Sequence, residues 1–87
     1  MAPETAAAIL KAMGHPLRYQ IVTMLLEESK SVGEIEYETG AHQANVSQHL
    51  KELRTVGIVG AERSGTTKYY SIAPERLDTV QAIVGAL

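Results

Sequence analysis

The stretch from residue 41 to residue 59, AHQANVSQHLKELRTVGIV, most constrains what this chain can fold into. At about 100° per residue on a helix, Val46, Leu50 and Leu53 fall on one narrow face that must be buried. The opposite face is polar, ends in a cation and has no carboxylate in its N-terminal half; it carries Ala44, Asn45, Ser47, Gln48, Lys51 and Thr55. Amide side chains pair bidentately with adenine, and small or hydroxyl side chains fit other base edges. The stretch therefore predicts a helix that enters a DNA major groove, with an ordinary amphipathic surface helix as the alternative.

The residues before this stretch predict a shorter helix over 32–38. Ser31 is a good N-cap, and Glu34 three residues later completes a capping box. Gly40 stands where a left-handed residue ends a helix. The predicted buried anchors are Val32, Ile35 and Tyr37. A short capped helix, a tight break and a second amphipathic helix form a helix-turn-helix, predicted over residues 31–56, in which the second helix reads the major groove.

The residues after the stretch predict a β-hairpin. Gly57 ends the helix, and β-rich segments at 58–63 and 66–72 flank a Ser64-Gly65 turn signal. A hairpin that directly follows a helix-turn-helix is a wing, predicted over residues 58–72.

The wing is predicted to carry cations near its tip. Arg63 and Lys68 are spaced to flank a phosphate backbone or to enter a minor groove. Tyr70 and Ile72 are predicted to share one face of the hairpin. That face is expected to exclude the other residues of the second strand, Lys68, Tyr69 and Ser71.

Three further helices are expected, over residues 4–13, from Pro16 to about Glu28, and over 74–87. Both terminal helices are apolar on one side, although a single domain of 87 residues needs few extra helices to close. Their predicted use is to pack against the same helices of a second copy. The expected fold is mainly α with a small β-hairpin (α+β): one winged helix-turn-helix domain over residues 1–87, in the order α-α-α-α-β-β-α, dimeric through its terminal helices.

Composition excludes several classes of protein. No cysteine is present, so there is no disulfide, thiolate metal site or thiol switch. No apolar run approaches the ~18 residues needed to cross a bilayer, and the start MAPETAAAIL lacks the basic region of a signal peptide, so a cytoplasmic protein is expected. No nucleophile elbow, phosphate-binding glycine loop or zinc-protease motif is present, so no enzyme is expected.

The charge is unevenly distributed along the chain. The formal net charge is -2, but residues 41–71 hold four basic and two acidic side chains, whereas residues 1–40 hold three basic and six acidic ones. Positive charge is therefore concentrated around the predicted reading helix and wing, where phosphates would lie.

Taken together, GHPLRYQIVTMLL, SVGEIEYETGAHQANVSQHLKELRTVGIV and ERSGTTKYYSI resemble the ArsR family of winged-helix transcriptional repressors over roughly residues 12–72. The resemblance rests most on the segments PLR at 16–18, SVGE at 31–34, VSQHL at 46–50 and YY at 69–70. It implies a dimer built from the first and last helices that binds an imperfect inverted repeat in a promoter and blocks transcription. It also implies an effector that lowers the affinity for DNA.

The usual sensors of that family are absent from this sequence. Residues 34–38 lack the cysteines of one metal-sensing branch, and residues 74–87 lack the histidines of another. A small ligand, a partner protein or no effector at all remain as options. No metal site and no cofactor are predicted.

Other candidate ligands favour structural interpretations. Glu34 and Glu38 are spaced to hold a hard cation, but a solvated acidic face is the favoured interpretation. His49 falls at the edge of the buried stripe, which favours a hydrogen bond to a phosphate or to the core over metal binding. His15 precedes Pro16 on a different element and is expected to set helix geometry. His42 and His49 are seven residues apart and could share a helix side only loosely, so no zinc site is expected.

The predicted function is sequence-specific DNA binding by a dimeric transcriptional repressor on an inverted-repeat operator. The alternative is a winged helix that binds protein or RNA, which an apolar or acidic reading face would favour. The first part of the reading helix is predicted to contact bases or adjacent phosphates. Its last turns and the wing are predicted to contact the DNA backbone. The predicted contact residues are His42, Gln43, Ala44, Asn45, Ser47, Gln48, His49, Lys51, Arg54, Arg63, Thr66, Thr67 and Lys68.

Overall fold

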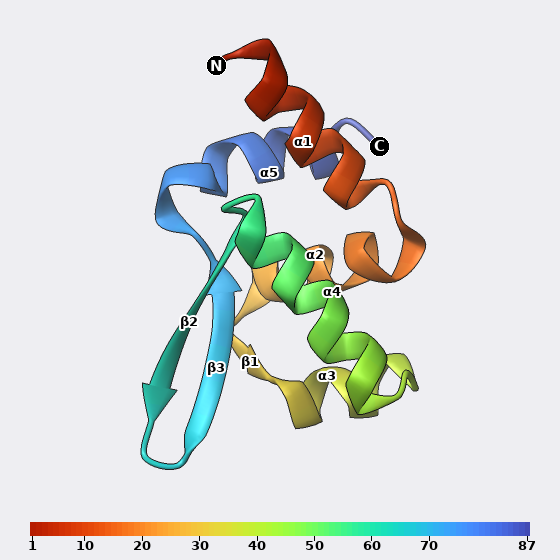
Figure 1. Ribbon diagram of the computed structural model, residues 1–87, viewed down its shortest axis with the longest axis vertical. Coiled ribbons are helices and arrows are strands. Elements are labelled where there is room, and N and C mark those ends of the chain that lie inside the picture. Colours follow the sequence, from red (N-terminus) through yellow and green to blue (C-terminus); the bar gives the residue numbers. More distant parts are fainter.

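Five α-helices, a 3-10 turn and three short strands make up the chain, and the computed structural model describes residues 1–87 (Figure 1). Their order is α1 (Pro3–Met13), α2 (Pro16–Glu27), β1 (Lys30–Ser31), α3 (Val32–Thr39), α4 (Gln43–Thr55), β2 (Val59–Ser64), β3 (Thr67–Ile72), a 3-10 turn (Pro74–Arg76) and α5 (Leu77–Gly85). The predicted α+β class and the winged helix-turn-helix order are confirmed, with one strand added.

The corner between α1 and α2 is fixed by two local hydrogen bonds. The ring nitrogen Nδ1 of His15 accepts from the backbone N–H of Leu17 at 3.2 Å, so His15 caps α2 while Pro16 occupies its first turn. Arg18 donates through Nε to the carbonyl oxygen of Ala12 at 2.7 Å. The structural role expected of His15 is thus confirmed.

The helix-turn-helix forms as its caps predict. Ser31 Oγ accepts from the N–H of Glu34 at 3.2 Å, and Glu34 Oε1 accepts from the N–H of Ser31 at 2.9 Å. Gly40 ends α3 with φ 73°, a left-handed conformation that favours glycine. Together these caps hold α3 at the short turn into α4.

The prediction that Tyr37 anchors α3 is wrong. Ile35 is fully buried, whereas Tyr37 is 90% exposed. Two helical positions rotate a side chain by about 200°, so Tyr37 points away from the face that Ile35 buries.

The sheet has one strand more than predicted. Strands β2 and β3 pair antiparallel from Val59↔Ile72 to Ser64↔Thr67, and Gly65 turns between them with φ 63°. The two-residue strand β1 adds to the other side of β3 through Lys30↔Tyr70 and Ser31↔Tyr69, which gives the order β1-β3-β2. The wing is thereby joined to the start of the helix-turn-helix.

The prediction that Lys68 lies off the face shared by Tyr70 and Ile72 is also wrong. Alternate residues of a strand point to the same side, so residues 68, 70 and 72 share one face. Lys68 Nζ lies 5.5 Å from the centroid of the Tyr70 ring, within range of a cation–π interaction.

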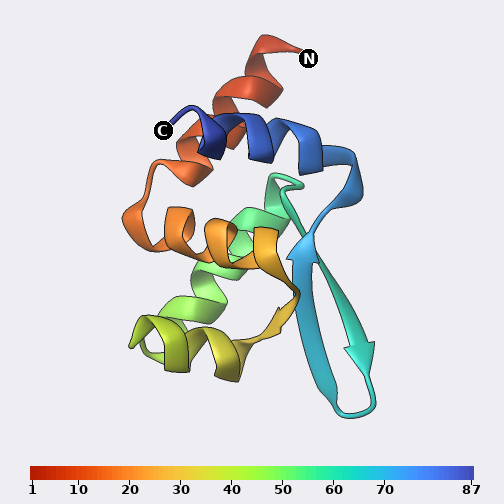
Figure 2. The ribbon, with the colours of Figure 1, turned by 180° about the vertical axis from the view of Figure 1, so that it is seen from behind.

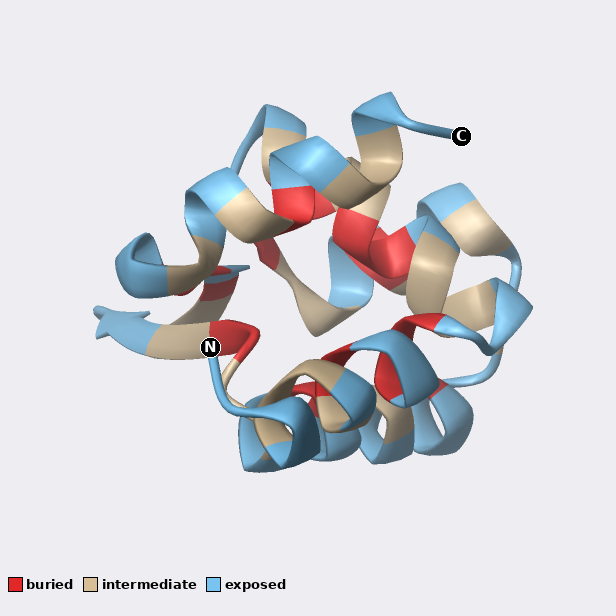
Figure 3. Ribbon diagram, turned by 90° about the horizontal axis from the view of Figure 1, so that it is seen from above, coloured by how far each residue is buried: buried red, intermediate tan, exposed pale blue.

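One hydrophobic core joins all of these elements. Val46, Leu50 and Leu53 of α4 are fully buried, as the sequence predicts, and they belong to a cluster of 15 buried residues. Figure 3 shows the buried positions along the inner sides of the helices and the exposed positions outside. The core therefore determines which side of α4 faces outward.

The two terminal helices lie at the same end of the molecule, and the wing tip and the start of α4 lie at the other (Figures 1 and 2). The last helix was predicted from Pro74, but a 3-10 turn occupies Pro74–Arg76 and α5 begins at Leu77. Apolar side chains remain exposed on or beside these helices, namely Leu10 (56%), Leu77 (37%) and Leu87 (86%). No helix has the length and apolar character needed to cross a membrane.

Candidate nucleic-acid interface

The outer face of α4 is open to solvent along its whole length. Its polar residues are all exposed, whereas the residues of its inner stripe have no exposed surface. The exposed predicted contacts of this segment are His42, Gln43, Ala44, Asn45, Ser47, Gln48, Lys51 and Arg54. The structure thus brings eight of the nine predicted contact residues between positions 42 and 54 to the surface.

The amide of Gln48 is held in place by the next turn of the helix. Its Nε2 donates to Glu52 Oε1 at 3.3 Å. This contact leaves the amide oxygen and one N–H free, which is the donor and acceptor pair that a bidentate contact to a base edge needs. Glu52 is the one carboxylate of α4, and it lies a turn beyond the residues predicted to read bases.

His49 is the exception among the predicted contacts, because it turns inward. Its ring packs on that of His15, with the two ring centroids 4.3 Å apart and the planes tilted by 42°. Nδ1 of His49 is buried without a hydrogen-bond partner. Burial lowers the pKa of His49, and the neighbouring His15 and Arg18 lower it further. The helix period alone could not show this pairing, because it joins two separate elements.

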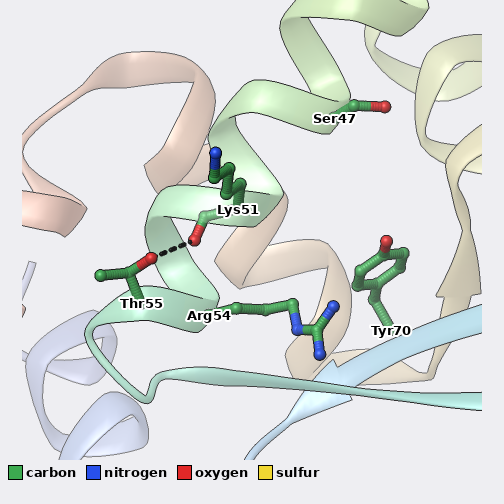
Figure 4. Close-up of a pocket in the computed structure, with 5 residues that line it drawn as sticks. All are labelled: Ser47, Lys51, Arg54, Thr55 and Tyr70. Atoms are coloured by element: carbon green, nitrogen blue, oxygen red, sulfur yellow. Dashed lines mark hydrogen bonds between the residues drawn. The ribbon is translucent and has the colours of Figure 1, made fainter.

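A groove lies between α4 and strand β3, and we call it the α4–β3 groove. It encloses about 340 Å³ and is lined by Ser47, Lys51, Arg54, Thr55 and Tyr70 (Figure 4). The hydroxyl of Thr55 is already hydrogen-bonded within the helix, since its Oγ1 donates to the carbonyl oxygen of Lys51 at 2.9 Å. Both ion pairs of the chain involve Lys30, so Lys51 and Arg54 line the groove without an ion-pair partner. With no carboxylate in its lining, the groove is suited to an anion.

The wing carries two more cations close together. Arg63 and Lys68 are directly opposite in the register of β2 and β3 and therefore share one face. Arg63 and Thr66 are exposed, while Thr67 and Lys68 are half-buried. Like charges at directly opposite positions destabilise a sheet, and an anionic partner would relieve that repulsion.

Glu34 and Glu38 of α3, which the sequence offered as a possible cation site, are engaged in structural contacts. Glu34 belongs to the capping box, where the N–H of Ser31 lowers the pKa of its carboxyl. Glu38 Oε2 lies 2.8 Å from Nζ of the buried Lys30, and this hydrogen bond is the main reason that the pKa of Lys30 is raised. Glu28 Oε1 lies 3.2 Å from the same Nζ. No group of three or more histidine, aspartate or glutamate side chains is placed to hold a metal ion.

Tyr70 is the groove residue that sequence reasoning missed. Its alternation with Ile72 predicted a core side chain, and its ring is indeed buried. The pairing of β3 with its neighbours brings the same residue to the edge of α4. No signal within the strand itself indicates that second contact.

Comparison with known proteins gives a consistent result. The family model described as "Bacterial regulatory protein, arsR family" matches residues 15–60. The chain is 39% identical over 84 residues to the nodulation protein NolR of Rhizobium meliloti. The aligned region covers 97% of this chain and 66% of that protein. The chain therefore spans about two thirds of the length of that relative.

Solved structures of related proteins superpose on this chain over nearly its whole length. HlyU from Vibrio cholerae superposes with a TM-score of 0.86 at 31% identity and covers 99% of this chain and 97% of its own. The winged helix-turn-helix domain of Mb0332 from Mycobacterium bovis, described as homodimeric, gives a TM-score of 0.85 at 32% identity over 95% of this chain and 77% of that chain. Relatives of this kind are transcriptional regulators, which confirms the prediction that the chain is not an enzyme. With more than half of its length matched by the family model, the chain belongs to the ArsR family of bacterial regulatory proteins.

Proposed function

We propose that this protein is a dimeric transcriptional repressor that binds an inverted-repeat operator through the outer face of α4. The observation that carries the proposal is the exposed polar face of that helix. It has no carboxylate over its first nine residues, and the N-terminal part of α4 lies at the same end of the molecule as the wing tip (Figure 1).

The first turns of α4 would enter the major groove. The start of the recognition helix reaches base edges in helix-turn-helix proteins. Gln43, Asn45, Ser47 and Gln48 are exposed there and offer amide and hydroxyl groups to bases or to adjacent phosphates. Ala44 would allow a thymine methyl to approach, and the exposed His42 would face the DNA at the start of the helix.

The backbone would be held on both sides of this helix. Lys51 and Arg54 supply unpaired charge along α4, and Arg63, Thr66, Thr67 and Lys68 supply charge and hydroxyl groups on the wing. We assign His49 an indirect part, because its contact with His15 holds the inner side of the reading helix against α2.

The terminal helices would form the dimer. Leu10 and Leu77 are large apolar side chains that remain exposed on α1 and at the start of α5, at the end of the molecule opposite the wing tip. A 60–90-residue chain buries little surface by itself, so a second copy adds stability. Mb0332, which this chain resembles, is described as homodimeric. Two-fold symmetry would then place the two reading helices about 34 Å apart, one turn of DNA.

Repression is the regulatory outcome that we propose, because a dimer covering a promoter blocks polymerase without a further partner. The named relative HlyU is described as a transcriptional activator, so in vitro transcription from a promoter that carries the operator is part of the test. An effector, if one exists, would be a small molecule or a partner protein. Action on chromosomal DNA places the proposed role in the cytoplasm.

The test begins with light scattering on the purified protein and a salt series of binding to random duplex DNA. We expect a dimer whose affinity for DNA falls steeply with salt concentration, because the cationic side chains of the protein displace counterions from the DNA when it binds. Selection from a random duplex library should then enrich an inverted repeat, and added protein should reduce transcription from it. A monomer that is indifferent to duplex DNA would refute the proposal.

A further inference from the structure

We propose that the α4–β3 groove binds one phosphodiester of the DNA backbone, and that the hydroxyl of Tyr70 donates a hydrogen bond to it beside Lys51 and Arg54. This inference rests on the proposed function and adds a contact that comes from the sheet side of the groove.

The lining of the groove has the chemistry of a phosphate site. Lys51 and Arg54 are unpaired cations, and the hydroxyls of Ser47 and Tyr70 are additional donors (Figure 4). Figure 4 shows Arg54 reaching from α4 and Tyr70 reaching from β3 on opposite sides of the space. Hydrogen bonds from several such donors, some of them charged, are the usual means of holding a phosphate oxygen.

Tyr70 is built with one end buried and one end open. The residue as a whole is only 9% exposed and belongs to the core cluster. None of the side-chain hydrogen bonds of the chain involves its hydroxyl, and that oxygen is not among the enclosed atoms that lack a partner. The hydroxyl therefore reaches solvent. Packing of the ring alone would need only phenylalanine, so the hydroxyl at the open end is available to bond a ligand.

A third cation lies near the same side chain. Lys68 Nζ is 5.5 Å from the centroid of the Tyr70 ring, on the face of the hairpin that also carries Arg63. The potential around the hydroxyl is thus set by positive groups of both α4 and the wing. Such a region attracts an anion before any direct contact is made.

A phosphodiester in this groove would contact α4 and the wing at once. Phosphate contacts fix the orientation of a protein on the duplex and carry no direct sequence information. Loss of the Tyr70 hydroxyl should therefore weaken operator and non-operator DNA by the same factor. Tyrosine is neutral, so the loss should leave the salt dependence unchanged, whereas loss of Lys51 or Arg54 should lower the salt slope by about 1 for each subunit of the dimer.

The experiment compares Tyr70→Phe with wild type on operator and random duplexes across a salt series. We expect affinity about tenfold weaker on both duplexes with an unchanged salt slope, as for the loss of a hydrogen bond to a charged acceptor. The matched control is Tyr69→Phe, because Tyr69 lies outside the groove lining, directly opposite Glu62 on the other face of the hairpin. We expect this control to bind as wild type does.

Duplexes with a single neutral methylphosphonate locate the phosphate independently. At the position that contacts the groove, the methylphosphonate should weaken wild type, and Tyr70→Phe should then cause no further loss. Should Tyr70→Phe fail to fold, the same scan with the exposed variant Arg54→Ala must show one position at which the two losses do not add. The inference alone is overturned if wild type binds duplex DNA in a salt-dependent way and Tyr70→Phe binds within twofold of wild type. It is also overturned if the losses from the substitution and from the methylphosphonate add at every position. Absence of duplex binding by wild type overturns the proposed function as well.

Discussion

The side chain of Gln48 illustrates how one contact within a helix prepares a residue for recognition. Glu52 accepts from its Nε2 at 3.3 Å and so restricts the amide to one orientation at the surface. Ordering a long polar side chain before it binds reduces the entropy lost on binding. The proposed base contact therefore depends on a residue one turn away that itself reads no base.

Replacing Gln48 with alanine tests the reading face directly. We expect a loss of about 1–3 kcal/mol in binding the operator and a relaxed preference at one base pair of each half-site. Competition among operators with single base changes measures both effects. Gln20→Ala serves as the control, because Gln20 is an exposed glutamine on α2, outside the proposed DNA contacts. An unchanged affinity and preference in Gln48→Ala would show that the reading face is assigned wrongly.

The burial of His49 beside His15 makes folding sensitive to pH. Burial lowers the pKa of His49 from 6.5, with further lowering by His15 and Arg18 and a small opposing effect of Glu52. The unfolded chain therefore binds a proton more readily than the folded chain does. The stability from the neutral His49 is complete above about pH 6.5 and declines as pH falls below that value.

Denaturant unfolding between about pH 7.5 and pH 5.5 measures this dependence, a window above the titration of most carboxyls. We expect the free energy of unfolding to fall across it in wild type and to fall less in His49→Gln. His42→Gln is the control, because His42 is exposed on the outer face. Equal slopes for wild type and His49→Gln would refute the explanation.

At the scale of elements, the wing is a hairpin that carries like charges on one face. Arg63 and Lys68 are directly opposed, and β1 joins the hairpin to the start of α3. The wing is consequently held in place by the sheet while its cations remain available.

Lys68→Ala should weaken binding to all duplexes alike and reduce the salt slope by about 1 for each subunit of the dimer, as expected for a phosphate contact. Binding isotherms at several salt concentrations on operator and random DNA measure this change. Lys11→Ala, shown by light scattering to remain dimeric, provides a matched control, because Lys11 is an exposed cation on α1, at the other end of the molecule. A selective loss for the operator would instead indicate that Lys68 reads sequence.

At the scale of the whole molecule, the two ends of the structure have different surfaces. Apolar side chains are exposed on the terminal helices, and polar and cationic side chains gather on α4 and the wing. A dimer formed at the first end would leave both reading helices free at the second.

Leu10→Asp tests that arrangement, because Leu10 is 56% exposed and its replacement leaves the core intact. We expect the variant to be monomeric by light scattering and at least about tenfold weaker on the inverted repeat, since linked half-sites bind with an avidity that single ones lack. Tyr37→Ser is the control for oligomeric state, as Tyr37 is a 90% exposed aromatic side chain on α3. A Leu10→Asp protein that remains dimeric would place the interface elsewhere.

Most of the fold follows from signals that act within a few residues. The buried stripe of α4, the capping box of Ser31 and Glu34, and the left-handed Gly40 are all confirmed. Periodicity and caps are properties of one element, so the chain order alone reveals them. The predictions for Tyr37 and Lys68 are wrong because the helix period and the strand period were applied incorrectly. Both periods, applied correctly, place these two residues where the structure has them.

Contacts between elements follow instead from packing, which no local pattern describes. The two residues of β1 form a strand only because β3 lies beside them, and His15 meets His49 only because the start of α2 packs on α4. Tyr70 lines the α4–β3 groove for the same reason. The local sequence thus determines which residues of each helix face outward. The tertiary arrangement determines which of those residues share a binding surface, because a shared surface depends on distances between segments far apart in the chain.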